Sequence, residues 1–99
     1  MITGISVLCE VAKGTFASEY FVRIKMANGD LWEGPVDKEM IFDLNREPNG
    51  EEYVQARMYA YLISFDARVA LVELPIEESS LGRRIAVLTQ SVRRERVPA

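Results

Sequence analysis

The sequence predicts a mostly β fold: an antiparallel small barrel or sandwich of about six strands with at most one short helix. Apolar and polar residues alternate with a period of two in six segments, which is typical of half-buried strands. Short stretches rich in Gly, Pro, Asn and Asp separate these segments, as in strands joined by tight turns. The 99 residues, 48% of them hydrophobic and 27% charged, fit one globular domain, residues 1–99.

Three strands are expected in the first part of the chain. Residues 5–12 alternate, and residues 19–26 do so again after a break at Lys13-Gly14. Residues 30–35 follow Asn28-Gly29, a pair that favours the positive φ angles of a two-residue type I′ turn. The second and third segments are therefore predicted to form a hairpin.

A two-residue turn fixes the register of this hairpin, because it sets Lys25 opposite Trp32. One face then holds the expected core residues, with Glu33 as an interruption: Tyr20, Val22, Ile24, Met26, Leu31 and Pro35. The other face holds Phe21, Arg23, Lys25, Trp32 and Val36. This register predicts that Trp32 lies on the outer face, either exposed, or covered by the aliphatic stems of Lys25 and Arg23, or packed under a loop.

Alternation stops in the middle of the chain. Asp37 is a candidate N-cap for a short helical turn through Met40 and Ile41. The segment 45–52, NREPNGEE, contains Pro and Asn-Gly and is typical of an exposed loop.

Three more strands are expected in the second half. Residues 54–65 give the longest strand pattern, and residues 69–74 are nearly all apolar, which indicates a central strand. A loop over residues 75–82 leads to a last strand at 84–92. Residues 93–99 are predicted to be a frayed C-terminal tail.

Charge and cysteine content narrow the class of protein. The net charge of −3 and the pI of about 5.0 argue against a general nucleic-acid binder, although residues 53–99 carry seven basic and five acidic side chains. A single cysteine excludes an internal disulfide and suits a reducing cytoplasm, the expected location. The N-terminus lacks a signal-peptide pattern, and no apolar run is long enough to span a membrane.

The residues usually needed for catalysis are missing, and we expect no enzyme activity and no cofactor. The chain has no histidine, so it lacks the commonest general base and metal ligand. Cys9 lies on the apolar side of its segment, which favours a role in the core. Glu47, Glu51 and Glu52 lack the ligand spacing of a calcium loop, so no metal site is predicted.

One candidate surface is the outer row of segment 54–65. Tyr53, Arg57, Tyr59 and Tyr61 share that row with Gln55 and Ile63. Tyrosine and arginine are enriched at protein interfaces, but the same row is also compatible with packing against a second layer of the same chain. Because a short chain has little structure to cover both faces of this strand, we expect self-association, as a homodimer.

A second candidate surface is the outer face of the predicted hairpin. Phe21 and Trp32 would stack bases there, while Arg23 and Lys25 would contact phosphates. Clustered arginines near the C-terminus, at 83–84 and 93–96, would add positive charge or only increase solubility. The alternative function is therefore a small barrel that binds single-stranded nucleic acid or an anionic ligand.

The stretch 22–34, VRIKMANGDLWEG, resembles the bent central hairpin of Sm-like and SH3-like small barrels. The likeness covers about a dozen residues and has the pattern of many β-hairpins. The N-terminal helix and the second short motif of Sm-like proteins are absent. The resemblance therefore implies a small barrel and no family membership.

Overall fold

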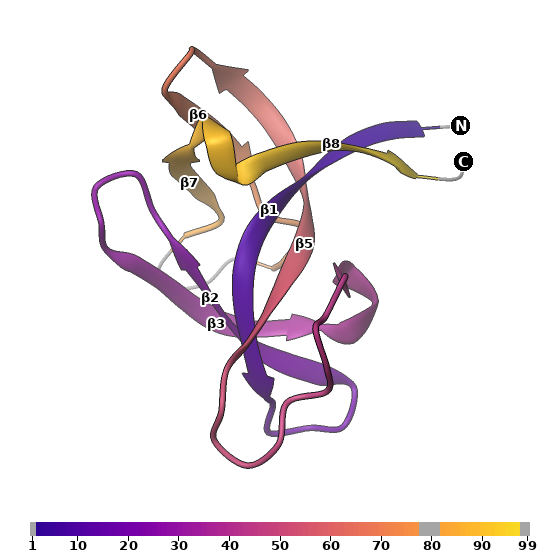
Figure 1. Cartoon of the computed structure of the whole chain (residues 1–99). Coiled ribbons are helices and arrows are strands. Elements are labelled where there is room, and N and C mark those ends of the chain that lie inside the picture. The colour runs from indigo at the N-terminus through magenta and orange to yellow at the C-terminus, as the bar shows by residue number, and fades with distance from the viewer. Residues whose placement is uncertain (1, 78–81, 98–99) are drawn as a thin grey trace.

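The chain folds into one antiparallel sheet that is curled into a half-barrel, as the computed structural model shows for residues 2–77 and 82–97 (Figure 1). The strands are β1 (Ile2–Lys13), β2 (Glu19–Lys25), β3 (Leu31–Asp37), β4 (Ile41–Phe42), β5 (Val54–Phe65), β6 (Val69–Glu73), β7 (Arg84–Leu88) and β8 (Val92–Val97). Two 3₁₀ turns, η1 (Lys38–Met40) and η2 (Thr89–Ser91), are the helical elements of these residues. The predicted fold class, a mostly β small barrel, is confirmed.

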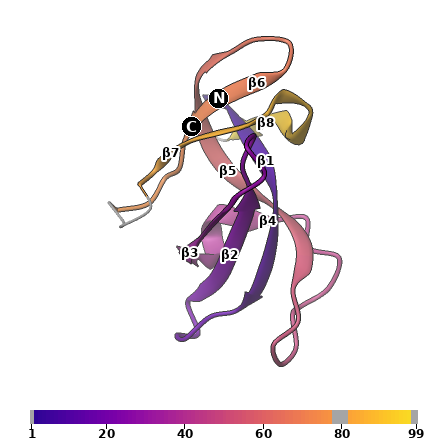
Figure 2. The same ribbon diagram turned by 90° about the vertical axis from the view of Figure 1, so that its left-hand side faces the viewer.

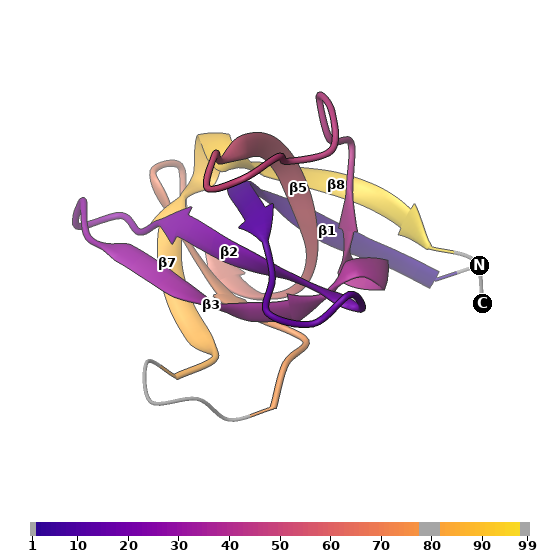
Figure 3. The same ribbon diagram turned by 90° about the horizontal axis from the view of Figure 1, so that it is seen from below.

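Strands β1 and β5 form the centre of the sheet. The strand order is β3-β2-β1-β5-β6-β7, with β4 attached to β5 and β8 attached to β1. Residues 5–11 of β1 pair with β5, residues 10–13 pair with β2, and residues 2–7 pair with β8. Seen from below, the strands wrap around a common interior (Figure 3).

The core fills the concave side of this curled sheet. Its largest side chains with almost no exposure are Val7, Val11, Val22, Ile24, Trp32, Met58, Val72, Leu74 and Val87. They come from both central strands and from both flanking hairpins, so one apolar cluster connects the whole sheet. Burial of each such side chain contributes roughly 1.5–3 kcal/mol, which makes this cluster the main source of stability.

Hydrogen bonds connect the two ends of the half-barrel. The backbone N–H of Ala27, in the turn between β2 and β3, donates to the carbonyl of Ala86 in β7 at 2.8 Å. The indole N–H of Trp32 donates to the carbonyl of Gly82 at 2.9 Å. These bonds hold the first hairpin against the last part of the sheet. None of the helical turns in the described residues is long or apolar enough to cross a bilayer.

The register predicted for the β2–β3 hairpin is wrong by one residue. Lys25 lies opposite Leu31, and Ile24 lies opposite Trp32. The N–H of Met26 donates to the carbonyl of Asp30 at 2.8 Å, so the turn contains three residues. Of these three, only Gly29 has a positive φ, of 93°, whereas a type I′ turn needs positive φ at both central residues.

This shift reverses the faces of β3, since neighbouring residues of a strand point to opposite sides. Trp32, Gly34 and Val36 face the core, and Leu31, Glu33 and Pro35 face outward. The expected surface position of Trp32 is therefore corrected: its side chain is 1% exposed.

The prediction of a frayed tail over 93–99 is also wrong for the part that the structure describes. Residues 92–97 form β8, which pairs along β1 from Val7↔Val92 to Ile2↔Val97. The predicted strand 84–92 ends earlier, at Leu88, and η2 then redirects the chain. The reason is tertiary: β1 extends beyond β2 and offers a strand edge that the C-terminal residues cover.

The predictions for β5, for the helical turn after Asp37 and for the loop 45–52 agree with the structure. Strand β5 has the predicted bounds, and the helical turn after Asp37 is present as η1, although the Asp37 side chain makes no cap hydrogen bond. Residues 45–52 form a loop that extends from the end of the molecule opposite the β5–β6 hairpin (Figure 2). Residues 78–81 of the predicted 75–82 loop lie outside the described part.

Candidate interaction surface

The predicted nucleic-acid face loses two of its four elements. Trp32 lies in the core and cannot stack a base. The guanidinium of Arg23 pairs with Glu10, with 2.9 Å between Nε and Oε1, and lies 3.8 Å from the ring centroid of Tyr53. The hydrogen bond to Glu10 raises the pKa of Arg23 above its ordinary value, and the same carboxylate neutralises its charge locally.

The other two members of that face, Phe21 and Lys25, remain on the convex side of β2. Phe21 is half-buried opposite Pro35, and Lys25 is exposed opposite Leu31. Glu33 lies opposite Arg23 on the same surface. A face with alternating positive and negative groups provides little attraction for a phosphate backbone.

The predicted tyrosine row does lie on one face of β5, because its even-numbered neighbours Val54, Ala56, Met58 and Ala60 are buried. Most of the row is covered by the chain itself. Tyr53 lies under Arg23, and Tyr59 stacks on Phe42 with 4.4 Å between ring centroids. Tyr53 and Tyr59 are thus partly covered by their own chain, while Gln55 between them is exposed.

Arg57 belongs to a polar cluster that holds β8 and η2 on the sheet. Its Nε donates to the Oγ of Ser6 at 2.7 Å, and its Nη2 donates to the carbonyl of Ser91 at 2.8 Å. Burial lowers the pKa of Arg57, and the nearby charge of Arg93 adds to that effect. The sequence analysis placed Arg57 in a candidate interface, but its Nε and Nη2 donate within the chain.

Two carboxylates complete this cluster. Ser6, fully buried, donates from its hydroxyl to Glu95 at 2.8 Å. Arg93 pairs with Glu95 and also with Asp43, at 2.9 Å between Nη2 and Oδ2. The hydrogen bond from Arg93 is the main reason that the pKa of Glu95 lies below its ordinary value. Positive and negative charges balance in this cluster, and its contacts hold β8 on the sheet.

Tyr61 differs from the rest of the row because it is 62% exposed. It begins a group of exposed apolar side chains on the outer half of β5, which we call the β5 strip and define as Tyr61, Leu62, Ile63 and Phe65. Leu62, Ile63 and Phe65 are 40%, 44% and 66% exposed. Four large apolar residues within five positions leave both faces of this part of β5 partly exposed, unlike a single exposed aromatic residue.

A β-bulge shapes this strip. The register between β5 and β6 shifts between Leu62 and Ser64, which leaves Ile63 as the extra residue. Leu62 therefore lies opposite Val72, and Phe65 lies opposite Ala70, so both point toward the concave side. Leu62 and Phe65 are three residues apart, so strict alternation would place them on opposite faces of β5. A prediction based on alternation alone therefore misses the bulge.

A fork in the sheet exposes the strip. Strand β1 leaves β5 after the pair Ile5↔Ala60 and continues with β8 as a two-stranded ribbon, while β5 continues with β6 (Figure 1). The angle of the fork contains a cleft of about 460 Å³ lined by Gly4, Ile5, Tyr61, Leu62 and Arg94. Within the described part of the chain, the Arg94 side chain forms no ion pair or hydrogen bond, although its backbone pairs with β1.

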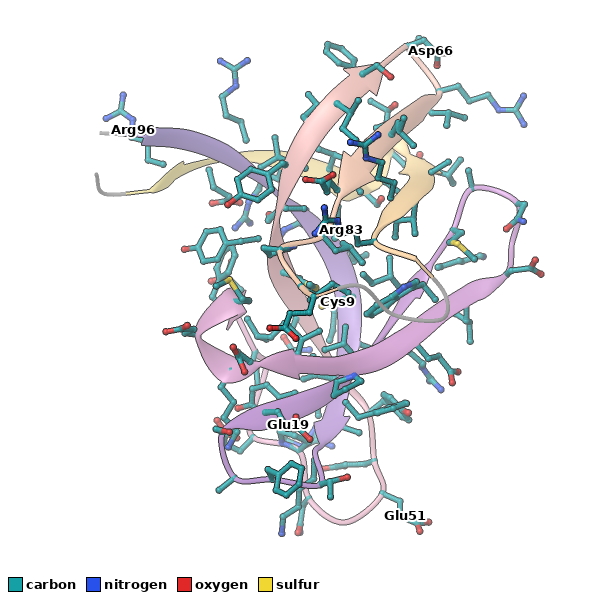
Figure 4. All side chains as sticks on the ribbon, turned by 180° about the vertical axis from the view of Figure 1, so that it is seen from behind. Cys9, Glu19, Glu51, Asp66, Arg83 and Arg96 are labelled. Carbon is teal, nitrogen blue, oxygen red and sulfur yellow. The ribbon has the colours of Figure 1, made fainter. Side chains whose placement is uncertain are left out.

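Cys9, the pair Arg83–Arg84 and the acidic side chains are the other polar groups to consider among the described residues. Cys9 is buried, and its burial raises the thiol pKa to about 12, so the thiol stays protonated near neutral pH (Figure 4). Arg83 and Arg84 both lie within ion-pair distance of Glu73. Among the described residues, no three His, Cys, Asp or Glu side chains form a group that could hold a metal ion.

The fold and this surface define a small, curled, antiparallel β domain with an exposed strand edge. Protein-family models, curated proteins and solved structures were each compared with the chain, and none matches it. A function therefore has to be argued from the surface itself.

Proposed function

We propose that this protein is a non-catalytic interaction module that self-associates as a dimer through the β5 strip. The observation that carries the proposal is the β5 strip at a strand edge with no partner in the described residues. Exposed apolar patches beside open strand edges are typical of contact surfaces, since both the apolar area and the backbone groups gain from being covered. The single cysteine fits a cytoplasmic module.

The β5 strip also bears on the role of the tyrosine row, which the sequence left open. The tyrosine row was compatible with an interface or with an internal layer, and Tyr53 and Tyr59 have partners within the chain. Tyr61 is the member of the row whose ring remains available to another molecule. We therefore assign the contact to Tyr61 and the residues that follow it.

Sedimentation velocity over a wide concentration range tests this function. The wild-type protein is expected to show a concentration-dependent dimer. Replacement of Tyr61 by Ala should weaken association by about 1–4 kcal/mol, the range of a hot-spot truncation. The melting temperature of the dilute, monomeric variant should stay unchanged, because the ring is largely in solvent.

Phe16→Ala provides the matched control. Phe16 is an aromatic residue with similar exposure, 68%, in the loop between β1 and β2 at the other end of the molecule. Its removal takes away the same kind of apolar surface without touching the strip, so association should be unchanged. A wild-type protein that stays monomeric throughout the range excludes the proposal, as does an equal loss of association in both variants.

Nucleic-acid binding is not proposed as a second function. The residues that would stack and neutralise a strand are used elsewhere: Trp32 lies in the core and Arg23 pairs with Glu10. Arg94, whose side chain has no ion pair within the described residues, lines the cleft of the fork.

A further inference from the structure

The outer half of β5 has one backbone edge that nothing in the described chain uses. Residues 61–65 pair with β6 along one edge. On the opposite edge, β1 pairs with β5 only as far as Ala60. Unpaired N–H and C=O groups along a strand are a ready template for another strand.

The limits of this free edge are sharp. It begins after Ala60, whose edge Ile5 already occupies. It ends before Asp66, whose N–H donates to the carbonyl of Val69 at 2.9 Å and whose carboxylate accepts from the backbone of Arg68 and Val69 in the turn to β6. Five residues, 61–65, are therefore open to a partner strand.

A second copy of the same strand fits this edge in one antiparallel register better than in any other. When Ile63 lies opposite Ile63 of the second copy, all five residues are paired. Tyr61 then lies opposite Phe65 of the second copy, and Leu62 lies opposite Ser64. A shift in either direction leaves residues unpaired or brings the second strand against Ile5. Twofold symmetry makes the contact closed, so it stops at a dimer.

Three features favour a second copy as the occupant. The segment 61–65, YLISF, has no charged residue, so pairing with itself causes no repulsion. On the concave face, Leu62 and Phe65 of the second copy come to neighbouring positions in this register, and this apolar cross-strand contact forms twice. The bulge at Ile63 increases the local twist of this edge, so a regular strand matches it poorly. A second copy of β5 has the same bulge and therefore the same twist.

Charge adds a fourth feature. Asp66 of the second copy follows Phe65 and would lie at the fork, beside Tyr61. Arg94 lines the cleft there and forms no ion pair within the described chain. Backbone hydrogen bonds from Val69 and Arg68 lower the pKa of Asp66, so its carboxylate is charged at neutral pH and suited to meet a cation.

We propose that two copies of this chain pair edge to edge through residues 61–65 of β5, antiparallel, across a twofold axis at Ile63. This inference rests on the proposed self-association and names its geometry. The exposed side chains of the strip amount to on the order of 400 Å² per copy, which is near the lower limit for a specific contact. The dimer is accordingly weak and exchanges rapidly.

Cysteine cross-linking tests the geometry. Residues directly opposite each other in an antiparallel pair have Cα atoms about 4.5–5.5 Å apart, within the range that a disulfide spans. Ile63→Cys should therefore form a disulfide-linked dimer under mild oxidation. The wild-type protein is the background control, because its single thiol is buried.

Two further variants fix the register. Tyr61→Cys alone should not cross-link, because the two copies of residue 61 would be about 13 Å apart, four residues along a strand. A mixture of Leu62→Cys and Phe65→Cys chains should cross-link, because these two positions share the concave face and lie side by side across the axis. Circular dichroism checks that each variant keeps its strands.

The outcomes separate the geometry from the function. If sedimentation shows a dimer but Ile63→Cys does not cross-link, or Tyr61→Cys cross-links as fast, this pairing is wrong and self-association stands. If the wild-type protein is monomeric and no variant cross-links, both proposals fail. Selective linkage at Ile63 together with the mixed Leu62–Phe65 linkage supports the twofold pairing.

Discussion

The indole N–H of Trp32 donates to the carbonyl oxygen of Gly82 at 2.9 Å, across 50 residues of sequence. This bond joins β3 to the segment before β7, two ends of the sheet path that no strand ladder connects in the described residues. The ring itself fills the core between them. Trp32 thus combines a packing role with a specific polar contact.

Trp32→Phe should reduce the free energy of unfolding by about 1–3 kcal/mol, because it leaves a cavity in the core and removes the hydrogen bond from the indole to the Gly82 carbonyl. Urea denaturation followed by circular dichroism measures the change. The dimerisation constant should not change, since Trp32 is remote from the strip. An unaltered unfolding midpoint would contradict the role given to the indole.

Gly34 follows Trp32 by two residues on the same face of β3 and leaves room for its ring. A Cβ at residue 34 would lie 2.9 Å from Cη2 of Trp32, closer than atoms can pack without movement. Gly34→Ala should therefore destabilise the protein by about 1–3 kcal/mol through overpacking. Thermal unfolding provides the measurement. Combining Gly34→Ala with Trp32→Phe should relieve part of the loss, and strict additivity would argue against a clash.

The sequence predicted the strands well because alternation reports burial directly. The bounds of β5 matched, but the hairpin register did not, since Asn28-Gly29 is compatible with turns of two or three residues. A further signal was present in β3. One alternate set contains Glu33 and Pro35, while the other contains only Trp32, Gly34 and Val36, so the second set is the better core face.

The surface was harder to predict, for two physical reasons. The bulge at Ile63 lies in a segment without charges, so no change of pattern marks it. Strand β8 has charged residues on both faces and resembles a tail, and it is ordered by pairing with β1 and by the contacts of Glu95 and Arg93. Neither the bulge nor the ordering of β8 can be recognised from the residues of that segment alone.

The ion pair around Glu95 should make stability depend on pH. The folded-state pKa of Glu95 is below its ordinary value near 4.3, so its stabilising contribution is present above that pH and is lost as the pH falls through the folded pKa. Glu95→Gln should therefore be less stable than the wild type at pH 7, and the difference should shrink below pH ~4. Urea denaturation at several pH values tests this, and a constant difference would show that the charge is unimportant.

The thiol of Cys9 should report on global unfolding. Because burial raises its pKa to about 12, a disulfide reagent should react with it slowly in the native state and rapidly in denaturant. Thr15→Cys, at an exposed loop position, adds a thiol that should react at once and serves as the comparison. Reaction of both thiols at similar rates in the native protein would mean that β1 opens readily.

The pairing of β1 with β8 constrains the order in which the chain can fold. Strand β1 is the first to be synthesised, yet it needs β2, β5 and β8 to cover its edges. Pairing with β2 is local and fast, whereas pairing with β8 joins Ile2 to Val97 and must wait for the last residues. Until β8 is available, the N-terminal half of β1 offers an open edge, which makes the emerging chain most prone to wrong pairing before residues 92–97 appear.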